Sequence, residues 1–345
     1  MAKKEFDLVA LAAAYARDTG IPLNHPGLAE SFSEAAAKRL RGALTDPLLL
    51  HGSRTQNLFE AMVVSLGRFQ LFTPEDVGRV HSPDRLRAPD FRVVLPEGDQ
   101  WLIEVKNVRQ PDPLNQVTRM TANYLASLER YADLVGVPLR LAFYWSVWNL
   151  WTLVPAAPFR TRGGALKIAM QDAMVASELG RLGDVMLWTT PPLRVLIEGS
   201  AERQLRMEPD ASSITGGASL RIFSRGQELE DPKDRHLALI LADYGEWRIE
   251  GPRILDGFEH GAAEFISSPE EPSEDGMDGI GSASRIFSRY FDQNTIAGDA
   301  VIQLAGEPVP EWFAPIATWD FKNSRLPLWV GYMHPASGNQ DSRSD

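Results

Sequence analysis

Hydrophobic and polar residues alternate along the segment Trp101-Leu102-Ile103-Glu104-Val105-Lys106-Asn107. This period of two predicts a half-buried β-strand, because successive side chains of a strand point to opposite faces. One face is expected to carry Trp101, Ile103 and Val105, and the other to carry Leu102, Glu104 and Lys106. The pattern therefore places an acidic and a basic side chain next to each other on one rigid element.

The preceding segment, Phe91–Leu95, is also predicted to be a strand, with a turn from Pro96 to Asp99. A three-residue loop, Glu97-Gly98-Asp99, with Gly98 in the left-handed conformation would place Asp90 opposite Lys106 and Arg92 opposite Glu104. Residues that lie opposite each other share a face of the sheet, so Asp90, Glu104 and Lys106 would project together. A two-residue loop without a bulge would turn Asp90 to the other face. The hypothesis therefore requires an odd loop or a bulge.

Helices and further strands are predicted on both sides of this hairpin. Hydrophobic spacing and capping residues predict helices at about Glu5–Arg17, Pro26–Leu44, Thr55–Gly67, Gln116–Val135, Leu166–Leu182 and Asp234–Tyr244. The helix of residues 116–135 is expected to have an apolar stripe of Tyr124, Leu128, Tyr131 and Leu134. Strands are predicted in Leu139–Val154, on either side of Ser146–Asn149, and in Val185–Trp188, Leu193–Ile197 and Ser219–Phe223. The composition of Ser267–Ser284 predicts a flexible loop.

The aromatic residues of Leu139–Val154, among them Trp145, Trp148 and Trp151, have two interpretations. They could stack on unpaired bases, but alternating aromatics in a central strand are more typical of a core.

Composition limits the classes of protein that fit. The chain has 345 residues, no cysteine, 44% hydrophobic residues and a net charge of −11, so disulfides and thiolate metal sites are excluded. None of the six histidines lies at a metal-ligand spacing from another. No segment has the length of a membrane span and no signal peptide is recognised, so a cytoplasmic protein without membrane contact is expected. The acidity is regional: residues 1–200 carry 22 Lys and Arg against 21 Asp and Glu, whereas residues 201–345 carry 13 against 25.

The order of these residues resembles the PD-(D/E)xK nuclease superfamily, which includes restriction endonucleases and resolvases. The likeness lies in Pro89-Asp90, in Glu104-Val105-Lys106 and in Glu60 on the upstream helix, and covers roughly residues 50–155. It implies an α/β fold with a mixed central sheet flanked by helices, a restriction-endonuclease-like core. The Gln-x-x-x-Tyr motif of one exonuclease-like branch is absent, because Gln116 and Tyr124 are eight positions apart.

The predicted organisation has four parts: N-terminal helices in residues 1–50, the nuclease-like domain in 51–198, a second, acidic α+β domain in 199–335, and a disordered tail in 336–345. The acidic region is either a surface for a protein partner or a solubilising surface. Assembly into a homo-oligomer remains open.

The resemblance also implies a mechanism. Asp90, Glu104 and the backbone carbonyl of Val105 would hold Mg²⁺ or Mn²⁺, which prefer hard oxygen ligands. Lys106 would orient and help to deprotonate the attacking water, and Glu60 would recruit a second ion or fix a metal-bound water.

Three functions follow as alternatives. The first is a metal-dependent endonuclease hydrolysing DNA phosphodiester bonds, in restriction, phage defence or mobile-element processing. The second is a nucleic-acid-binding module of the same fold that does not cleave, and the third is an RNA nuclease. Arginines near the hairpin could bind phosphates; they are Arg79, Arg85, Arg87, Arg92, Arg109 and Arg119.

Overall fold

The computed structural model describes residues 8–75, 82–207, 214–274, 276–306, 308–309, 312–313, 316, 319 and 321–335. Its contacts divide the chain into two compact units, Met1–Ser53 and Arg54–Asp345. The tail predicted from residue 336 lies outside the described residues.

The first unit is helical. It contains α1 (Leu8–Thr19), α2 (Leu28–Leu44) and the first turns of α3 (Pro47–Leu66). A hydrogen bond of 2.6 Å between the hydroxyls of Tyr15 and Ser31 joins α1 to α2. The prediction that α3 begins at Thr55 is wrong, because Asp46 caps the helix by accepting hydrogen bonds from two backbone N–H groups of its first turn. Pro47 then suits the first helical position.

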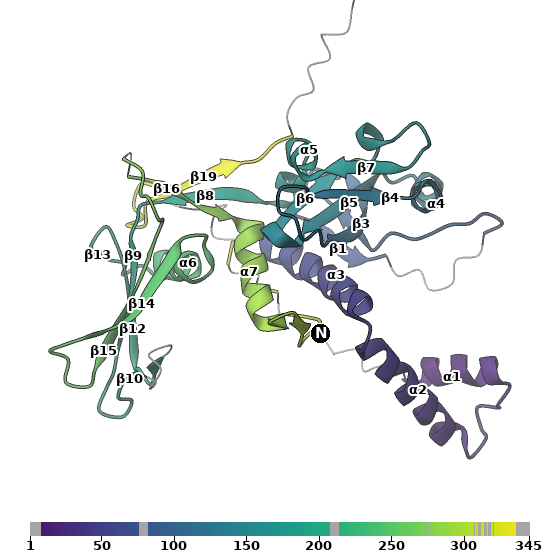
Figure 1. Cartoon of the computed structure of the whole chain (residues 1–345), viewed down its shortest axis with the longest axis horizontal. Helices are drawn as coiled ribbons and strands as arrows, with labels where there is room; N and C mark the ends of the chain where they lie inside the picture. Colours follow the sequence, from purple (N-terminus) through teal and green to yellow (C-terminus); the bar gives the residue numbers. More distant parts are fainter. Residues whose placement is uncertain are drawn as a thin grey trace, which may run out of the picture. The chain divides into compact units, whose positions relative to one another are not determined.

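A five-stranded mixed sheet forms the centre of the second unit, with the strand order β1-β2-β3-β5-β6 (Figure 1). Its strands are β1 (Leu71–Pro74), β2 (Phe91–Val94), β3 (Gln100–Val108), β5 (Leu139–Trp145) and β6 (Leu150–Val154). Only the pair β3–β5 is parallel; the other neighbours run antiparallel. The mixed α/β sheet expected from the sequence is confirmed.

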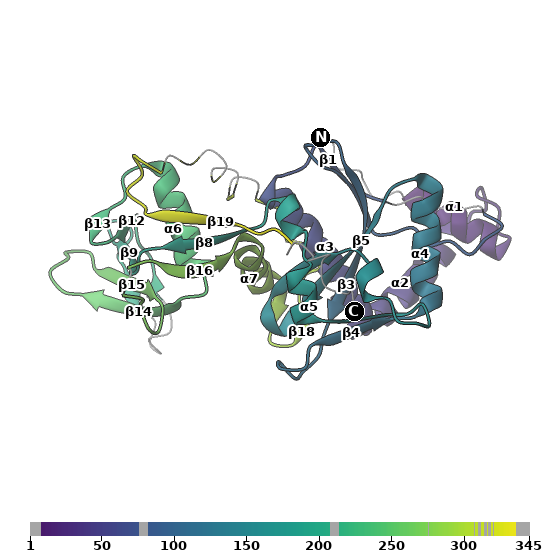
Figure 2. The same cartoon turned by 90° about the horizontal axis from the view of Figure 1, so that it is seen from above.

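Helices cover both faces of this sheet (Figure 2). Trp101, Ile103 and Val105 belong to the core cluster that contains α3 and α7 (Ala283–Thr295). Leu102 belongs to the cluster under α4 (Ala122–Val135). The predicted division of β3 into two faces is therefore confirmed, but the strand is buried on both faces rather than half-buried.

The β2–β3 hairpin has a three-residue loop, and the loop begins one residue earlier than predicted. Phe91 pairs with Ile103 and Val94 with Gln100, and the Leu95 N–H donates to the Asp99 carbonyl over 2.8 Å. Gly98 adopts a φ of +92°, in the left-handed region that favours glycine. The register therefore differs from the predicted one by two residues. A shift of two preserves the face of every side chain.

The predicted helix 116–135 begins only at Ala122, because Thr121 caps it by accepting from the Tyr124 N–H. Residues before the cap form β4 (Val117–Met120), which pairs with β7 (Leu166–Ala169). The predicted helix 166–182 is therefore also wrong in its first part, and helical turns follow in α5 (Met170–Val175) and η3 (Leu179–Leu182). Leu134 does not extend the buried stripe of α4, since it is 69% exposed.

Two further sheets involve the C-terminal residues. One has the order β13-β12-β9-β15-β14 and the other β16-β8-β19. The strands of the first are β13 (Gln227–Glu228), β12 (Ser219–Ser224), β9 (Leu193–Glu198), β15 (Ala262–Ser268) and β14 (Arg248–Leu255). Those of the second are β16 (Asp278–Ser282), β8 (Val185–Thr189) and β19 (Leu328–Tyr332). The flexible loop predicted for 267–284 is therefore shorter than expected, because its ends belong to β15, β16 and the start of α7.

The remaining elements are short, apart from α6 (Pro232–Tyr244), which packs on the first of these two sheets. They are α6, the 3-10 helices η1 (Ser146–Trp148) and η2 (Ala157–Phe159), and the strand pairs β10 (Arg206–Met207) with β11 (Ile214–Thr215) and β17 (Ile296–Ala297) with β18 (Ala300–Val301). Among the aromatics of β5 and β6, Trp145 and Trp151 are at most 2% exposed, whereas Trp148 is 40% exposed. The core interpretation is therefore confirmed for the strands, and Trp148 lies outside it.

Helix α7 packs against the central sheet and α3 (Figure 1). The buried Arg54 of α3 forms an ion pair with Asp292 and donates from Nε to the Thr295 hydroxyl over 2.8 Å. Trp151 of β6 donates to the Ser288 hydroxyl over 3.1 Å. Residues on both sides of the predicted 198/199 boundary therefore share one core, and the β9 strand before it pairs with β12 and β15 beyond it.

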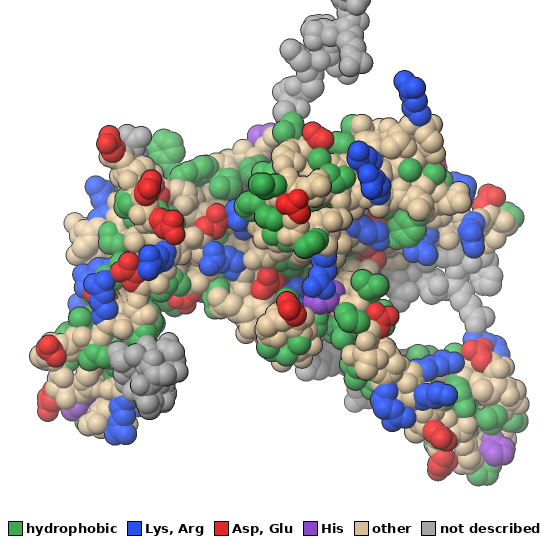
Figure 3. Space-filling model, in the orientation of Figure 1, with side chains coloured by type: hydrophobic (Ala, Val, Ile, Leu, Met, Phe, Trp, Pro, Cys, Tyr) green, Lys and Arg blue, Asp and Glu red, His purple; other side chains and the backbone are tan. Residues whose placement is uncertain are grey.

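A minority of the acidic residues in the C-terminal region form salt bridges among the described residues. These salt bridges join Arg194 to Glu264, Arg221 to Glu198 and Glu228, Arg253 to Glu250, Arg285 to Glu246 and Arg325 to Glu230. On the face shown in Figure 3, acidic and basic side chains are interspersed over this region. No helix among the described residues is long and apolar enough to cross a membrane.

Asp184 supports a prediction about stability and pH. Its carboxylate accepts from the N–H and hydroxyl of Ser284, but complete burial raises its pKa to about 6. A carboxyl with a raised pKa in the folded state stabilises the fold at low pH and loses that contribution as the pH rises. Relative to Asp184→Asn, the wild type should lose about 2 kcal/mol of unfolding free energy between about pH 4 and about pH 6, because the pKa of Asp184 is about 6 in the folded state and close to its ordinary value in the unfolded state.

Urea denaturation of both proteins at several pH values measures this difference. A constant gap between wild type and Asp184→Asn across that range would show that Asp184 does not titrate there.

Candidate active site

Asp90 lies directly before β2, at the start of the β2–β3 hairpin. Val105 lies beyond the part of β3 that pairs with β2, and its N–H donates to Asp90 Oδ2 over 2.7 Å. Burial, followed by the nearby charge of Glu104, raises the pKa of Asp90 to about 6. The Glu104 carboxylate is therefore close enough to oppose the ionisation of Asp90.

Glu104 is a buried acid in the middle of β3, with only 3% of its surface exposed. Buried carboxylates require partners, and Glu104 Oε1 has two: the Lys106 ammonium and the Tyr124 hydroxyl. Lys106 follows on the same face of the strand, which brings the acid and the base together as the alternation predicted.

Lys106 is held in its charged form. Burial acts to lower its pKa, but the adjacent Glu104 carboxylate and the hydrogen bonds to Glu104 and Tyr124 outweigh burial and raise the pKa. The ammonium also donates to the Tyr124 hydroxyl over 2.8 Å. A lysine whose pKa is raised donates hydrogen bonds at neutral pH and does not accept a proton. It therefore suits orientation of a water and stabilisation of negative charge better than the deprotonation that we expected from the resemblance.

Tyr124 was missed as a site residue. Its position in the first turn of α4 places the ring edge at the Glu104–Lys106 pair, while the Arg87 guanidinium lies 4.5 Å from the ring centre. The pattern of apolar residues suggested only packing, and the hydroxyl in that stripe was the available signal. Burial and then the Glu104 charge raise the pKa of Tyr124, so it acts as a neutral donor.

The arginines around the hairpin divide into two kinds. Arg92 is committed to a two-point ion pair with Glu75. Arg79 lies outside the described residues. Four others are exposed and form no salt bridge with any residue that the structure describes: Arg85, Arg87, Arg109 and Arg119. Arg87 is the one that acts electrostatically on Asp90.

The helix residue that contacts Asp90 is Gln56 of α3, whose Nε2 donates to Asp90 Oδ1 over 2.6 Å. Glu60, the predicted helix acid, lies one turn further along. Its pKa is raised by burial alone, without a contribution from another charged group of the site. Within the described ranges, no three His, Cys, Asp or Glu side chains are grouped closely enough to hold a metal ion. The structure therefore brings together Asp90, Glu104 and Lys106 but does not bring Glu60 to them.

The residues present fit a divalent cation. The buried Glu104 and the partly buried Asp90 form a spot of concentrated negative charge that a cation would relieve, and the charge of Glu104 helps to raise the pKa of Asp90. Their oxygens are hard ligands of the type that Mg²⁺ and Mn²⁺ prefer, and Mg²⁺ commonly takes only one or two carboxylates and keeps several waters.

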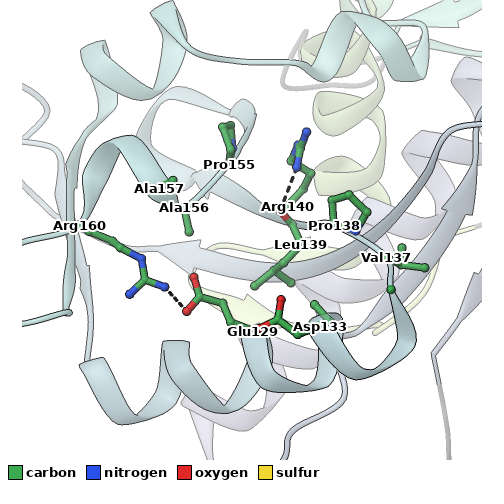
Figure 4. A pocket seen from close by; sticks show the side chains of 12 residues that line it. Glu129, Asp133, Val137, Pro138, Leu139, Arg140, Pro155, Ala156, Ala157 and Arg160 are labelled. Carbon is green, nitrogen blue, oxygen red and sulfur yellow. Dashed lines mark hydrogen bonds and ion pairs between the residues drawn. The ribbon is translucent and has the colours of Figure 1, made fainter.

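A surface pocket of about 590 Å³ lies elsewhere on the same unit, between α4, the start of β5 and residues 155–160 (Figure 4). Glu129 and Arg160 on its rim are turned toward each other as an ion pair, and Arg140 is paired with Glu178. None of Asp90, Glu104 or Lys106 lines it. The pocket is therefore separate from the carboxylate cluster.

Comparison with known proteins gives structural likenesses but no family. No family model matches the chain. No curated protein matches it either. A solved structure that resembles part of it is the Holliday junction resolvase Hjc from Archaeoglobus fulgidus, with 19% sequence identity and a TM-score of 0.24, over 33% of this chain and 85% of the resolvase. At this TM-score the likeness does not by itself establish a shared fold, so the site has to be judged by its own residues.

Proposed function

We propose that the protein is a metal-dependent nuclease that hydrolyses phosphodiester bonds in DNA. The observation that supports the proposal is the proximity of Asp90, Glu104 and Lys106 in the β2–β3 hairpin, where Lys106 contacts Glu104 and Asp90 accepts a hydrogen bond from the Val105 N–H. Two carboxylates beside a charged lysine meet the needs of phosphodiester hydrolysis, in which an anionic substrate must be approached by a nucleophile and negative charge must be stabilised.

In this mechanism Asp90, Glu104 and the Val105 carbonyl would hold Mg²⁺ or Mn²⁺, which would supply positive charge to stabilise the phosphate and to activate a water. Lys106, fixed by Glu104 and Tyr124, orients the attacking water and stabilises charge on the phosphate. Arg87, exposed beside the Tyr124 ring, contacts the phosphate backbone.

Cleavage assays with three substrates test the proposal. The protein is incubated with supercoiled DNA, single-stranded DNA and RNA, in Mg²⁺ and in EDTA. We expect DNA to be cut in Mg²⁺ only, and Asp90→Asn to reduce the rate by at least about 100-fold, because its neutral amide holds a cation poorly. The conservative change keeps the volume of the side chain.

Each alternative has its own result. Cleavage of RNA without cleavage of DNA would replace the proposed substrate. Tight binding without cleavage in either Mg²⁺ or Mn²⁺ would favour the non-cleaving module. Undiminished cleavage by Asp90→Asn would remove the assigned site.

A further inference from the structure

The residue that α3 presents to Asp90 is an amide and not a third acid. Gln56 Nε2 lies 2.6 Å from Asp90 Oδ1, whereas Glu60, four residues later, has no charged partner in the cluster. An α-helix turns by about 3.6 residues, so these two side chains lie on roughly the same face but are separated by about 5–6 Å along the axis. Helix α3 therefore places a neutral side chain, that of Gln56, beside Asp90 at the start of the hairpin.

This arrangement limits the charge that the site can balance. Asp90 and Glu104 are the two acids of the cluster, and no third carboxylate or imidazole joins them among the described residues. Lys106 and Arg87 already place two positive charges beside them. One divalent cation can be held by the two carboxylates, whereas a second cation would be repelled by the first and by both basic groups without a further acid to hold it.

We propose that Gln56 joins Asp90 and Glu104 in a site for a single divalent cation, and that the site does not take a second ion. The inference rests on the proposed function, since it concerns the same metal site. The amide suits this position because it carries a donor for Asp90 and an acceptor oxygen for a cation or its water, and adds no charge. Gln56 is a positioning residue in this scheme, because it acts on a carboxylate that holds the ion.

Counting bound Mn²⁺ on the full chain tests the inference without relying on activity. Free Mn²⁺ gives an electron paramagnetic resonance signal that is lost on binding, so titration yields stoichiometry and affinity. We expect one ion for the wild type. Gln56→Glu adds a carboxylate beside Asp90 and should bind a second ion. Gln56→Ala should still bind one ion, but with about 10- to 100-fold weaker affinity, which is the usual loss when a group that hydrogen-bonds to a metal ligand is removed.

Glu60→Gln is the matched control, since it removes a carboxylate one turn away on the same helix. It should leave stoichiometry and affinity unchanged. The thermal unfolding midpoint of each variant without metal shows whether it is folded, and Gln56→Ala decides the test if Gln56→Glu fails to fold.

The outcomes separate this inference from the proposed function. Two ions in the wild type, or loss of an ion in Glu60→Gln, would overturn the single-ion site and leave the nuclease proposal standing. Unchanged binding in both folded Gln56 variants would also overturn it. No ion in the wild type would overturn both proposals.

Discussion

Replacing Lys106 with methionine is expected to reduce metal-dependent DNA cleavage by about 100- to 10,000-fold, the range for loss of a group that positions or transfers a proton. Methionine keeps the length of the side chain but removes the ammonium that Glu104 and Tyr124 hold in place. Binding of Mn²⁺ should be preserved or become tighter, because a positive charge beside the two acids is removed. Rates and Mn²⁺ titrations measured on the same preparation separate these effects.

The exposed Lys167 of β7 offers a matched control, since Lys167→Met removes the same charge on a strand that carries no residue of the cluster. Its cleavage rate should stay close to that of the wild type. If Lys106→Met cleaved DNA within a few-fold of Lys167→Met, the lysine would have no part in the reaction.

The second large effect is expected on stability, at Arg54. Arg54 is 2% exposed, pairs with Asp292 and lies 5.3 Å from the centre of the Phe291 ring. Arg54→Met leaves Asp292 without its counter-charge, and removing one partner of a buried ion pair costs about 3–5 kcal/mol. Urea denaturation should show this decrease in unfolding free energy, and adding Asp292→Asn should recover part of it.

The exposed pair Arg253–Glu250 provides the comparison, with side chains 58% and 43% exposed. Arg253→Met should cost no more than about 1 kcal/mol, as is usual for surface ion pairs. Equal losses for Arg54→Met and Arg253→Met would mean that the buried network does not stabilise the fold.

The sequence predicted local features of the site better than it predicted distant contacts. Alternation in β3 was enough to place Glu104 and Lys106 on one face, because side-chain direction in a strand follows from parity alone. The hairpin register was displaced by two residues, since the turn could begin at either Pro96 or Glu97 without changing that parity. The strand parity of the hairpin was therefore predicted correctly although its exact pairing was not.

Contacts between distant segments could not be predicted from local patterns. Strand β4 forms because it pairs with β7, about fifty residues away, and a helical pattern in 116–120 carried no information about that partner. Gln56 and Glu60 are equally plausible residues of one helix face, and only the packing of α3 against the hairpin selects Gln56. Tyr124 became visible as a site residue for the same reason.

The packing of α7 has a consequence for a shortened chain. Its Phe287 and Phe291 fill the same core as α3 and the central sheet, although they come from the last fifth of the sequence. A fragment ending near residue 198 would lack these side chains and would expose the apolar residues that they cover. Such a fragment is therefore expected to aggregate rather than to fold as a separate unit.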